Sequence, residues 1–169
     1  MKRAILLLAT TALLLAWSAG AALADVRSGT GGNDLISGTN APDSLFGLAG
    51  VDLISGFGAD DLIRGGPDGD QLFGGNGSDA VHGGPGGDQL FGQDGSDLLT
   101  GGRGDDEIIA GESFRTGEDA VEAGHGDDEI DARDGIADLI DCGEGEDTVF
   151  FDAGLDAVEN CEESNPPPV

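Results

Sequence analysis

The sequence is poor in positive charge. It has 7 lysine and arginine residues against 34 aspartate and glutamate residues, a formal net charge of −27, and Lys2 is its only lysine. Such a surface repels nucleic acid and anionic membrane, because both need basic side chains to neutralise phosphate. We therefore expect no nucleic-acid partner, and we expect the acidic surface to attract cations.

The sequence also lacks the motifs of common secreted hydrolases. There is no H-E-x-x-H, no G-x-S-x-G and no EF-hand loop. Tyrosine is absent and the only tryptophan is Trp17, whereas a glycan-binding cleft normally uses such side chains. We therefore expect no catalytic residues and no enzyme activity.

The first 24 residues have the composition of a secretory signal peptide. Lys2 and Arg3 precede an apolar run, and small residues ending at Ala24 provide a cleavage site. Cleavage would remove both basic residues and take the net charge from −27 to about −29. We expect a secreted protein, extracellular or at the cell surface, with no membrane insertion after cleavage. An uncleaved anchor is the alternative, because the run is long enough to cross a bilayer.

What the chain has in abundance is glycine, 32 residues in all, arranged with a nine-residue period. If the recurring aspartate is numbered position six of each repeat, an aliphatic residue follows at position eight without exception from Ile36 to Ile108. The nine aspartates are Asp34, Asp43, Asp52, Asp61, Asp70, Asp79, Asp88, Asp97 and Asp106. An inward aliphatic between two variable residues is typical of a short strand, so we expect positions seven to nine to be strand and positions one to six a glycine-rich turn.

Three consecutive copies, residues 74–82, 83–91 and 92–100, follow the pattern G-G-x-G-x-D-x-U-x, where U is a large aliphatic, with one departure at Gln93. This pattern resembles the haemolysin-type, or RTX, calcium-binding nonapeptide repeat. The resemblance implies an all-β fold, a right-handed parallel β-roll (β-solenoid) of about thirteen nonapeptide repeats. It also implies that Ca²⁺ lies between turns two repeats apart, ligated by aspartate carboxylates and turn carbonyl oxygens.

Transferred to this chain, the resemblance pairs Asp70 with Asp88, Asp79 with Asp97, and Asp88 with Asp106. Weaker sites are expected at Asp43 and Asp61, where alanine replaces a turn glycine. The full set of implied metal ligands and turn residues is Asp34, Asp52, Asp70, Asp79, Asp88, Asp97, Asp106, Asp128, Gly66, Gly75, Gly77, Gly84, Gly86, Gly95, Gly102 and Gly104.

The period is less regular after Ile109. An insertion of four residues is expected around 112–115, the copy ending in Asp138 has one extra residue, and the copy opened by Cys142 closes the series. Cys142 and Cys161 are the only cysteines, and in an exported chain an isolated pair is most simply a disulfide, here one that caps the last coil.

These features predict a signal peptide at 1–24, a calcium-binding β-roll at 25–150, and a C-terminal cap with a disordered tail at 151–169. The expected function is that of a secreted calcium-binding structural or interaction module without catalysis. Two alternatives stay open: an accessory or targeting domain of a separate secreted hydrolase, and a calcium-rigidified surface or matrix adhesion protein. The sequence identifies no protein or glycan partner.

Overall fold

A computed structural model of the chain describes residues 23–110, 117–161 and 163–164. All regular elements in these ranges are β-strands, and they form two eight-stranded sheets. The first sheet contains β1 (Val26–Ser28), β3 (Ser44–Phe46), β5 (Leu62–Arg64), β7 (Ala80–Pro85), β9 (Leu98–Arg103), β11 (Ala120–His125), β13 (Leu139–Glu144) and β15 (Ala157–Glu159). The second contains β2 (Leu35–Ser37), β4 (Leu53–Gly58), β6 (Gln71–Asn76), β8 (Gln89–Asp94), β10 (Glu107–Ile109), β12 (Glu129–Ala132), β14 (Thr148–Phe151) and β16 (Glu163–Ser164).

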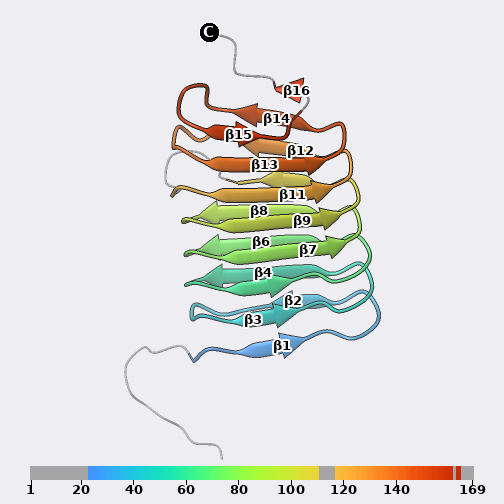
Figure 1. The fold of residues 1–169 in the computed structure, drawn as a ribbon. Coiled ribbons are helices and arrows are strands. Elements are labelled where there is room, and N and C mark those ends of the chain that lie inside the picture. The colour runs from blue at the N-terminus through green and yellow to red at the C-terminus, as the bar shows by residue number, and fades with distance from the viewer. Residues whose placement is uncertain (1–22, 111–116, 162, 165–169) are drawn as a thin grey trace, which may run out of the picture.

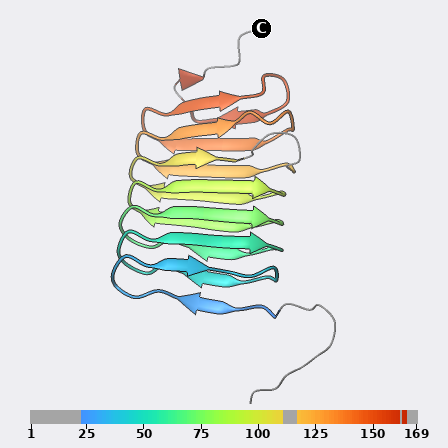
Figure 2. The ribbon, with the colours of Figure 1, turned by 180° about the vertical axis from the view of Figure 1, so that it is seen from behind.

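The chain alternates between the two sheets, so each pair of repeats makes one coil of a parallel β-roll (Figures 1 and 2). In the regular part, every residue pairs with the residue 18 positions further on; Leu72, for example, is in register with Leu90. This is the pairing of repeat n with repeat n+2 that the sequence predicts. The predicted all-β class and the parallel β-roll are confirmed.

The core is a column of aliphatic side chains between the two sheets. The position-eight residues from Leu45 to Val149 are almost completely buried. Position one of the next repeat also faces inward and carries glycine or another small residue, such as Ala123 or Cys142. Each position-eight side chain contributes about 1.5–3 kcal/mol by burial, so the roll has only a thin hydrophobic core.

Several strands, most of them in the middle of the roll, are longer than the three residues predicted for each repeat, whereas β1, β2, β3, β5, β10 and β15 have that length. β6 and β8 continue through positions one to three of the following repeat. The reason is that the backbone of these glycine-rich segments keeps its parallel pairing, as between Gly75 and Gln93. Hydrogen bonding between coils therefore includes half of the segment that was predicted to be turn.

The C-terminal end carries one copy more than the sequence pattern indicates. β15 pairs with β13 in register, and Val158 packs against the core. Cys142 and Cys161 form the predicted disulfide, with 5.2 Å between their Cα atoms. The bond ties β13, which contains Cys142, to the segment directly after β15, which is the capping position expected for it.

Three predicted features lie wholly or mostly outside the described residues. These are the signal segment, since residues 1–22 are not described, the insertion around residues 112–115, and the disordered tail, of which residues 162 and 165–169 are not described. Within the described ranges, there is no helix of the length and hydrophobicity that a membrane span requires.

Candidate metal centre

The position-six aspartates form two ladders, one on each edge of the roll. The aspartate immediately precedes a strand, and its backbone N–H donates to the Oδ1 of the aspartate in the next coil. For example, Asp70 donates to Asp88 at 2.7 Å, and Asp88 donates to Asp106 at 2.8 Å. The edge-one ladder is Asp25, Asp43, Asp61, Asp79, Asp97, Asp119, Asp138 and Asp156. The edge-two ladder is Asp34, Asp52, Asp70, Asp88, Asp106, Asp128 and Asp147.

The second carboxylate oxygen of the middle aspartates is buried and accepts no hydrogen bond from the described residues. Asp88, for example, is only 1% exposed. The aspartates with such an Oδ2 include Asp52, Asp61, Asp70, Asp79, Asp88, Asp97, Asp106, Asp119, Asp128 and Asp138. A buried acceptor without a partner costs about 1–3 kcal/mol, and more when it is charged. A cation beside each of these oxygens would remove that cost.

Burial raises the pKa of nine carboxyl groups of the ladders, and for most of them the charges of neighbouring aspartates raise it further. The pKa rises from 3.8 to about 6 for Asp61, Asp70, Asp79, Asp97, Asp128 and Asp138, to about 7 for Asp106, and to about 8 for Asp119. Burial also raises the pKa of Asp88. Without a counter-charge these carboxyl groups therefore keep their protons to a higher pH than ordinary aspartates do, because the ionised form is disfavoured until a positive charge lies beside it.

The glycines bring further oxygen atoms to the same place. A Cβ on Gly74, at position one, would lie 2.6 Å from Asp79 Oδ2 and 2.7 Å from the carbonyl oxygen of Gly92 in the next coil. At position four, Gly77 has a φ of +135°, and a Cβ there would lie 2.5 Å from the carbonyl oxygen of Ala59. The turns thus place carboxylate and carbonyl oxygens together, which are the hard ligands that Ca²⁺ prefers.

Repeats that depart from the glycine pattern keep the same turn. Ala59 and Asp68 replace the glycine of position four and still have φ values of +69° and +78°. Gln93 does the same at position two, with a φ of +74°. Asp61, whose repeat contains Ala59, accordingly has the same buried and unpartnered Oδ2 as the regular copies.

The turns at the two ends of the roll are different, because they satisfy the second oxygen internally. Thr30 donates to Asp34 Oδ2 through its backbone N–H at 2.6 Å and its hydroxyl at 2.9 Å. Thr39 makes the same two bonds to Asp43 Oδ2, at 2.5 and 3.0 Å. At the C-terminal end, the N–H of Asp152 donates to Asp156 Oδ2 at 2.6 Å.

These bonds change the titration of Asp43. Burial raises its pKa, but hydrogen bonds from the Asp25 backbone and from Thr39, together with the charge of Arg27, bring the pKa below its ordinary value. Asp43 is therefore a stable carboxylate without any metal, unlike the middle aspartates.

The structure brings every predicted aspartate ligand into one of the two ladders, in the predicted neighbour pairs. The implied glycines all lie in the turns beside them, with positive φ. The ligand set transferred from the resemblance lacked Asp119 and Asp138. Their Oδ1 atoms accept from Asp97 and Asp119 across 22 and 19 residues, so the ladder continues through the irregular copies. A broken period concealed them, although each still stands two residues before an aliphatic.

A shallow groove follows the edge-two ladder. It is lined by Asp70, Asp88 and Asp106 with the glycines before the first two, and its outer wall carries Glu107 and Glu129. The groove gives solvent a path along the carboxylates and surrounds that path with negative charge. Such a field concentrates cations at the ladder.

A parallel β-roll with buried carboxylate ladders on both edges defines a cation-binding solenoid. The sequence profile of the RTX calcium-binding nonapeptide repeat matches residues 28–56, 55–90 and 82–113, and the chain belongs to this family. Searches of curated proteins and of solved structures gave no match. Calcium is the ion that the family binds, and the buried carboxylate oxygens of the middle coils fit it in chemical type.

Proposed function

We propose that this protein is an exported structural module that binds several calcium ions between the stacked turns of its middle coils and has no catalytic activity. The observation that carries the proposal is the repeated Oδ2 atom, buried and without a hydrogen bond, on both edges of the roll. The ligands would be the position-six carboxylates and the turn carbonyl oxygens, with Asp70, Asp88 and Asp106 on edge two and Asp79 and Asp97 on edge one.

Calcium would supply the stability that the core does not. Ordering nine residues per repeat costs roughly 1–2 kcal/mol each, against one buried aliphatic side chain and the backbone bonds between coils. Stacked carboxylates add repulsion, about 4 kcal/mol at 4 Å for an effective dielectric of 20. Metal binding therefore becomes part of the folding free energy.

Export is supported by the disulfide and by the first segment. A bond between Cys142 and Cys161 persists in an oxidising compartment and is rare in the cytosol. We assign residues 1–24 to a signal peptide, 25–150 to the calcium-binding roll and 151–169 to a cap and tail, with an extracellular or cell-surface location.

The test is a calcium titration of the purified protein, followed by circular dichroism and by mass spectrometry under native conditions. We expect little β-structure in chelator, a cooperative gain of β-structure at millimolar calcium, and several bound ions per chain. Magnesium is the matched control and should act poorly, because it requires a tighter octahedral site and dehydrates reluctantly. Equal β content in chelator and in calcium would refute the proposal.

A further inference from the structure

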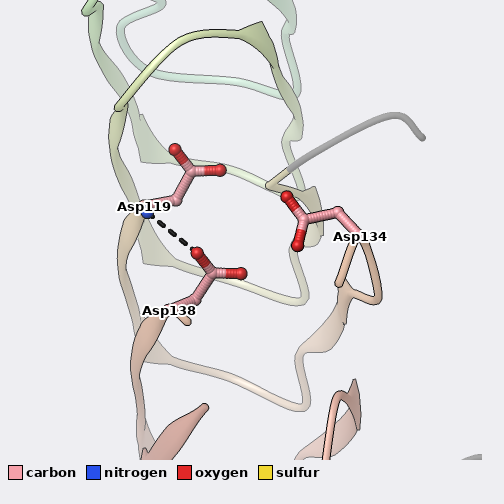
Figure 3. A group of neighbouring side chains, drawn as sticks. All are labelled: Asp119, Asp134 and Asp138. Atoms are coloured by element: carbon pink, nitrogen blue, oxygen red, sulfur yellow. Dashed lines mark hydrogen bonds between the residues drawn. The ribbon is translucent and has the colours of Figure 1, made fainter. Parts of the chain in front are cut away.

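One irregular repeat adds a third carboxylate to the edge-one ladder. The copy between Asp128 and Asp138 has ten residues in place of nine, and its turn joins β12 to β13. In this turn the side chain of Asp134 faces Asp119 and Asp138 (Figure 3). One oxygen from each of the three carboxylates lies within 4.8 Å of the other two, and this is the only such trio in the described ranges.

The loop that carries Asp134 is held in place by its neighbours. Arg133 binds Asp131 with its Nη2 2.5 Å from Oδ2, and its guanidinium lies 4.8 Å from the ring centroid of Phe150. On the other side, the N–H of Gly135 donates to Asp152 at 2.6 Å. The position of Asp134 is therefore built into the fold on both sides of the residue.

The other two carboxylates point to a ligand independently of the clustering. Asp119 and Asp138 are 2% and 4% exposed, and the Oδ2 of each is buried without a hydrogen bond from the described residues. Their Oδ1 atoms are occupied by the ladder, since Asp119 Oδ1 accepts from the N–H of Asp97 at 2.8 Å and Asp138 Oδ1 accepts from the N–H of Asp119 at 2.9 Å. The gap between these two coils thus has two buried carboxylate oxygens that accept no hydrogen bond from the described part of the chain, beside a third carboxylate.

The donor set suits calcium. All three side chains offer carboxylate oxygens, the hard ligands that Ca²⁺ prefers, and calcium–oxygen distances are about 2.3–2.6 Å. Two ligands on opposite sides of such an ion are up to about 5 Å apart. The three oxygens lie within 4.8 Å of one another, so one ion can contact all three.

We propose that Asp134, Asp119 and Asp138 form a three-carboxylate calcium site that differs from the regular gaps of the roll and fills before them. The proposal rests on the proposed function, since it assumes that the ladders take calcium. Its added content is an order of filling. Calcium affinity rises with the number of charged ligands, and within the described ranges no regular gap brings a third carboxylate oxygen within this distance.

Asp134→Asn is the decisive variant. The asparagine keeps an oxygen to accept from the N–H of Ile136, which donates to Asp134 Oδ1 at 2.8 Å, and removes only the charge. Glu122→Gln is the matched control, because it removes one charge from an exposed position on β11. Both would be compared with the unaltered protein by calorimetric calcium titration and by native mass spectrometry at limiting calcium.

We expect Asp134→Asn to weaken the tightest calcium-binding step tenfold or more and to lose the first bound ion at limiting calcium, while Glu122→Gln keeps both. If the two variants titrate alike, the three-carboxylate site is wrong while the regular sites stand. If the unaltered protein binds no calcium, the proposed function fails with it. Should Asp134→Asn not fold in saturating calcium, Asp134→Glu decides: tight first binding supports the site, and its loss overturns it.

Discussion

The turns at the ends of the roll and the turns in its middle hold the same aspartate in different ways. At the ends, Asp34, Asp43 and Asp156 accept hydrogen bonds on Oδ2 from the residue at position two of their own turn. In the middle, an aspartate such as Asp88 has its Oδ2 buried and without a partner. The protein itself therefore satisfies the carboxylates at the ends, whereas the carboxylates in the middle need a cation.

The difference follows from the backbone at position two. In the middle, this residue has a positive φ, and its N–H donates to the next coil, as Gly66 does to the carbonyl oxygen of Gly83 at 3.0 Å. At the N-terminal end, position two is Thr30 or Thr39, and the N–H points to the carboxylate instead. The positive φ that glycine adopts at position two therefore directs the backbone N–H of this residue away from the carboxylate. The Oδ2 atom is left without this donor and can bind calcium.

The largest expected effect is that of pH on the folding stability of the calcium-free chain. The middle aspartates have folded-state pKa values of about 6 to 8 against 3.8 in the unfolded chain. The folded roll therefore binds more protons than the unfolded chain between about pH 4 and pH 8, and its stability falls as pH rises through this window. One carboxyl moved to about 6 costs about 3 kcal/mol above pH 7, and several together exceed the usual 5–15 kcal/mol of a domain.

We therefore expect the chelated protein to gain β-structure near pH 4 and to lose it near pH 7. Calcium should abolish this dependence above pH 7, where it replaces the protons. Circular dichroism across pH, with and without chelator, measures both. A calcium-free chain that is equally folded at pH 4 and pH 8 would mean that folding does not raise the pKa values of the middle carboxyl groups.

Next in size is the replacement of one aspartate in the middle and one at the end. Asp88 lies between Asp70 and Asp106, so Asp88→Ala should remove about two calcium ions and raise the calcium concentration needed for folding. Asp43→Ala should lower stability without lowering the number of bound ions, because Thr39 already satisfies that carboxylate. Native mass spectrometry counts the ions in each variant.

Asp94→Ala is the charge control for these variants, since Asp94 is at the variable third position of a turn. It should bind the same number of ions as the unaltered protein. If Asp88→Ala and Asp94→Ala titrate alike, calcium acts only as a diffuse counter-ion to the net charge.

Reduction of the disulfide tests the C-terminal end separately. The bond closes a loop of about twenty residues and contributes on the order of 3 kcal/mol. In a solenoid, stability is mainly a matter of nearest neighbours, so reduction should loosen β13 and β15 and leave β6 to β9 protected. Hydrogen exchange in the presence of calcium measures the protection of each strand. A uniform loss of protection along the roll would contradict the prediction.

The smallest expected effect is that of Thr39→Val, which removes the hydroxyl that donates to the buried Asp43 carboxylate and accepts from the N–H of Ala41. We expect a loss of about 1.5–3 kcal/mol in the calcium-loaded protein and an unchanged number of bound ions. Thr100→Val, on the surface of β9, is the matched control and should be close to neutral. Chemical unfolding in saturating calcium compares the two, and a lost ion in Thr39→Val would show that the N-terminal turns bind calcium after all.

The sequence by itself determined the period, and with it most of the fold. Nine-residue spacing of aspartate and aliphatic residues fixes which side chains face inward and which turns stack, because a strand alternates its faces and a constant repeat keeps every coil in register. The resemblance to the RTX repeat added the neighbour pairs of the ladder, for instance Asp88 with Asp106, and the isolated pair of cysteines indicated the disulfide.

Only the tertiary structure decided what each carboxylate contacts. Asp34 and Asp88 occupy the same position of the repeat, and no spacing rule separates them. The two aspartates differ because the backbone N–H of the residue at position two donates within its own turn in one case and to the next coil in the other. Asp134 was likewise hidden, because an extra residue moves it out of the repeat while the stacking of Asp119 on Asp138 brings it back to their gap. Hydrogen bonds across coils and the path of an irregular loop are set by packing between distant segments, and these contacts decide which oxygens are left for a metal ion.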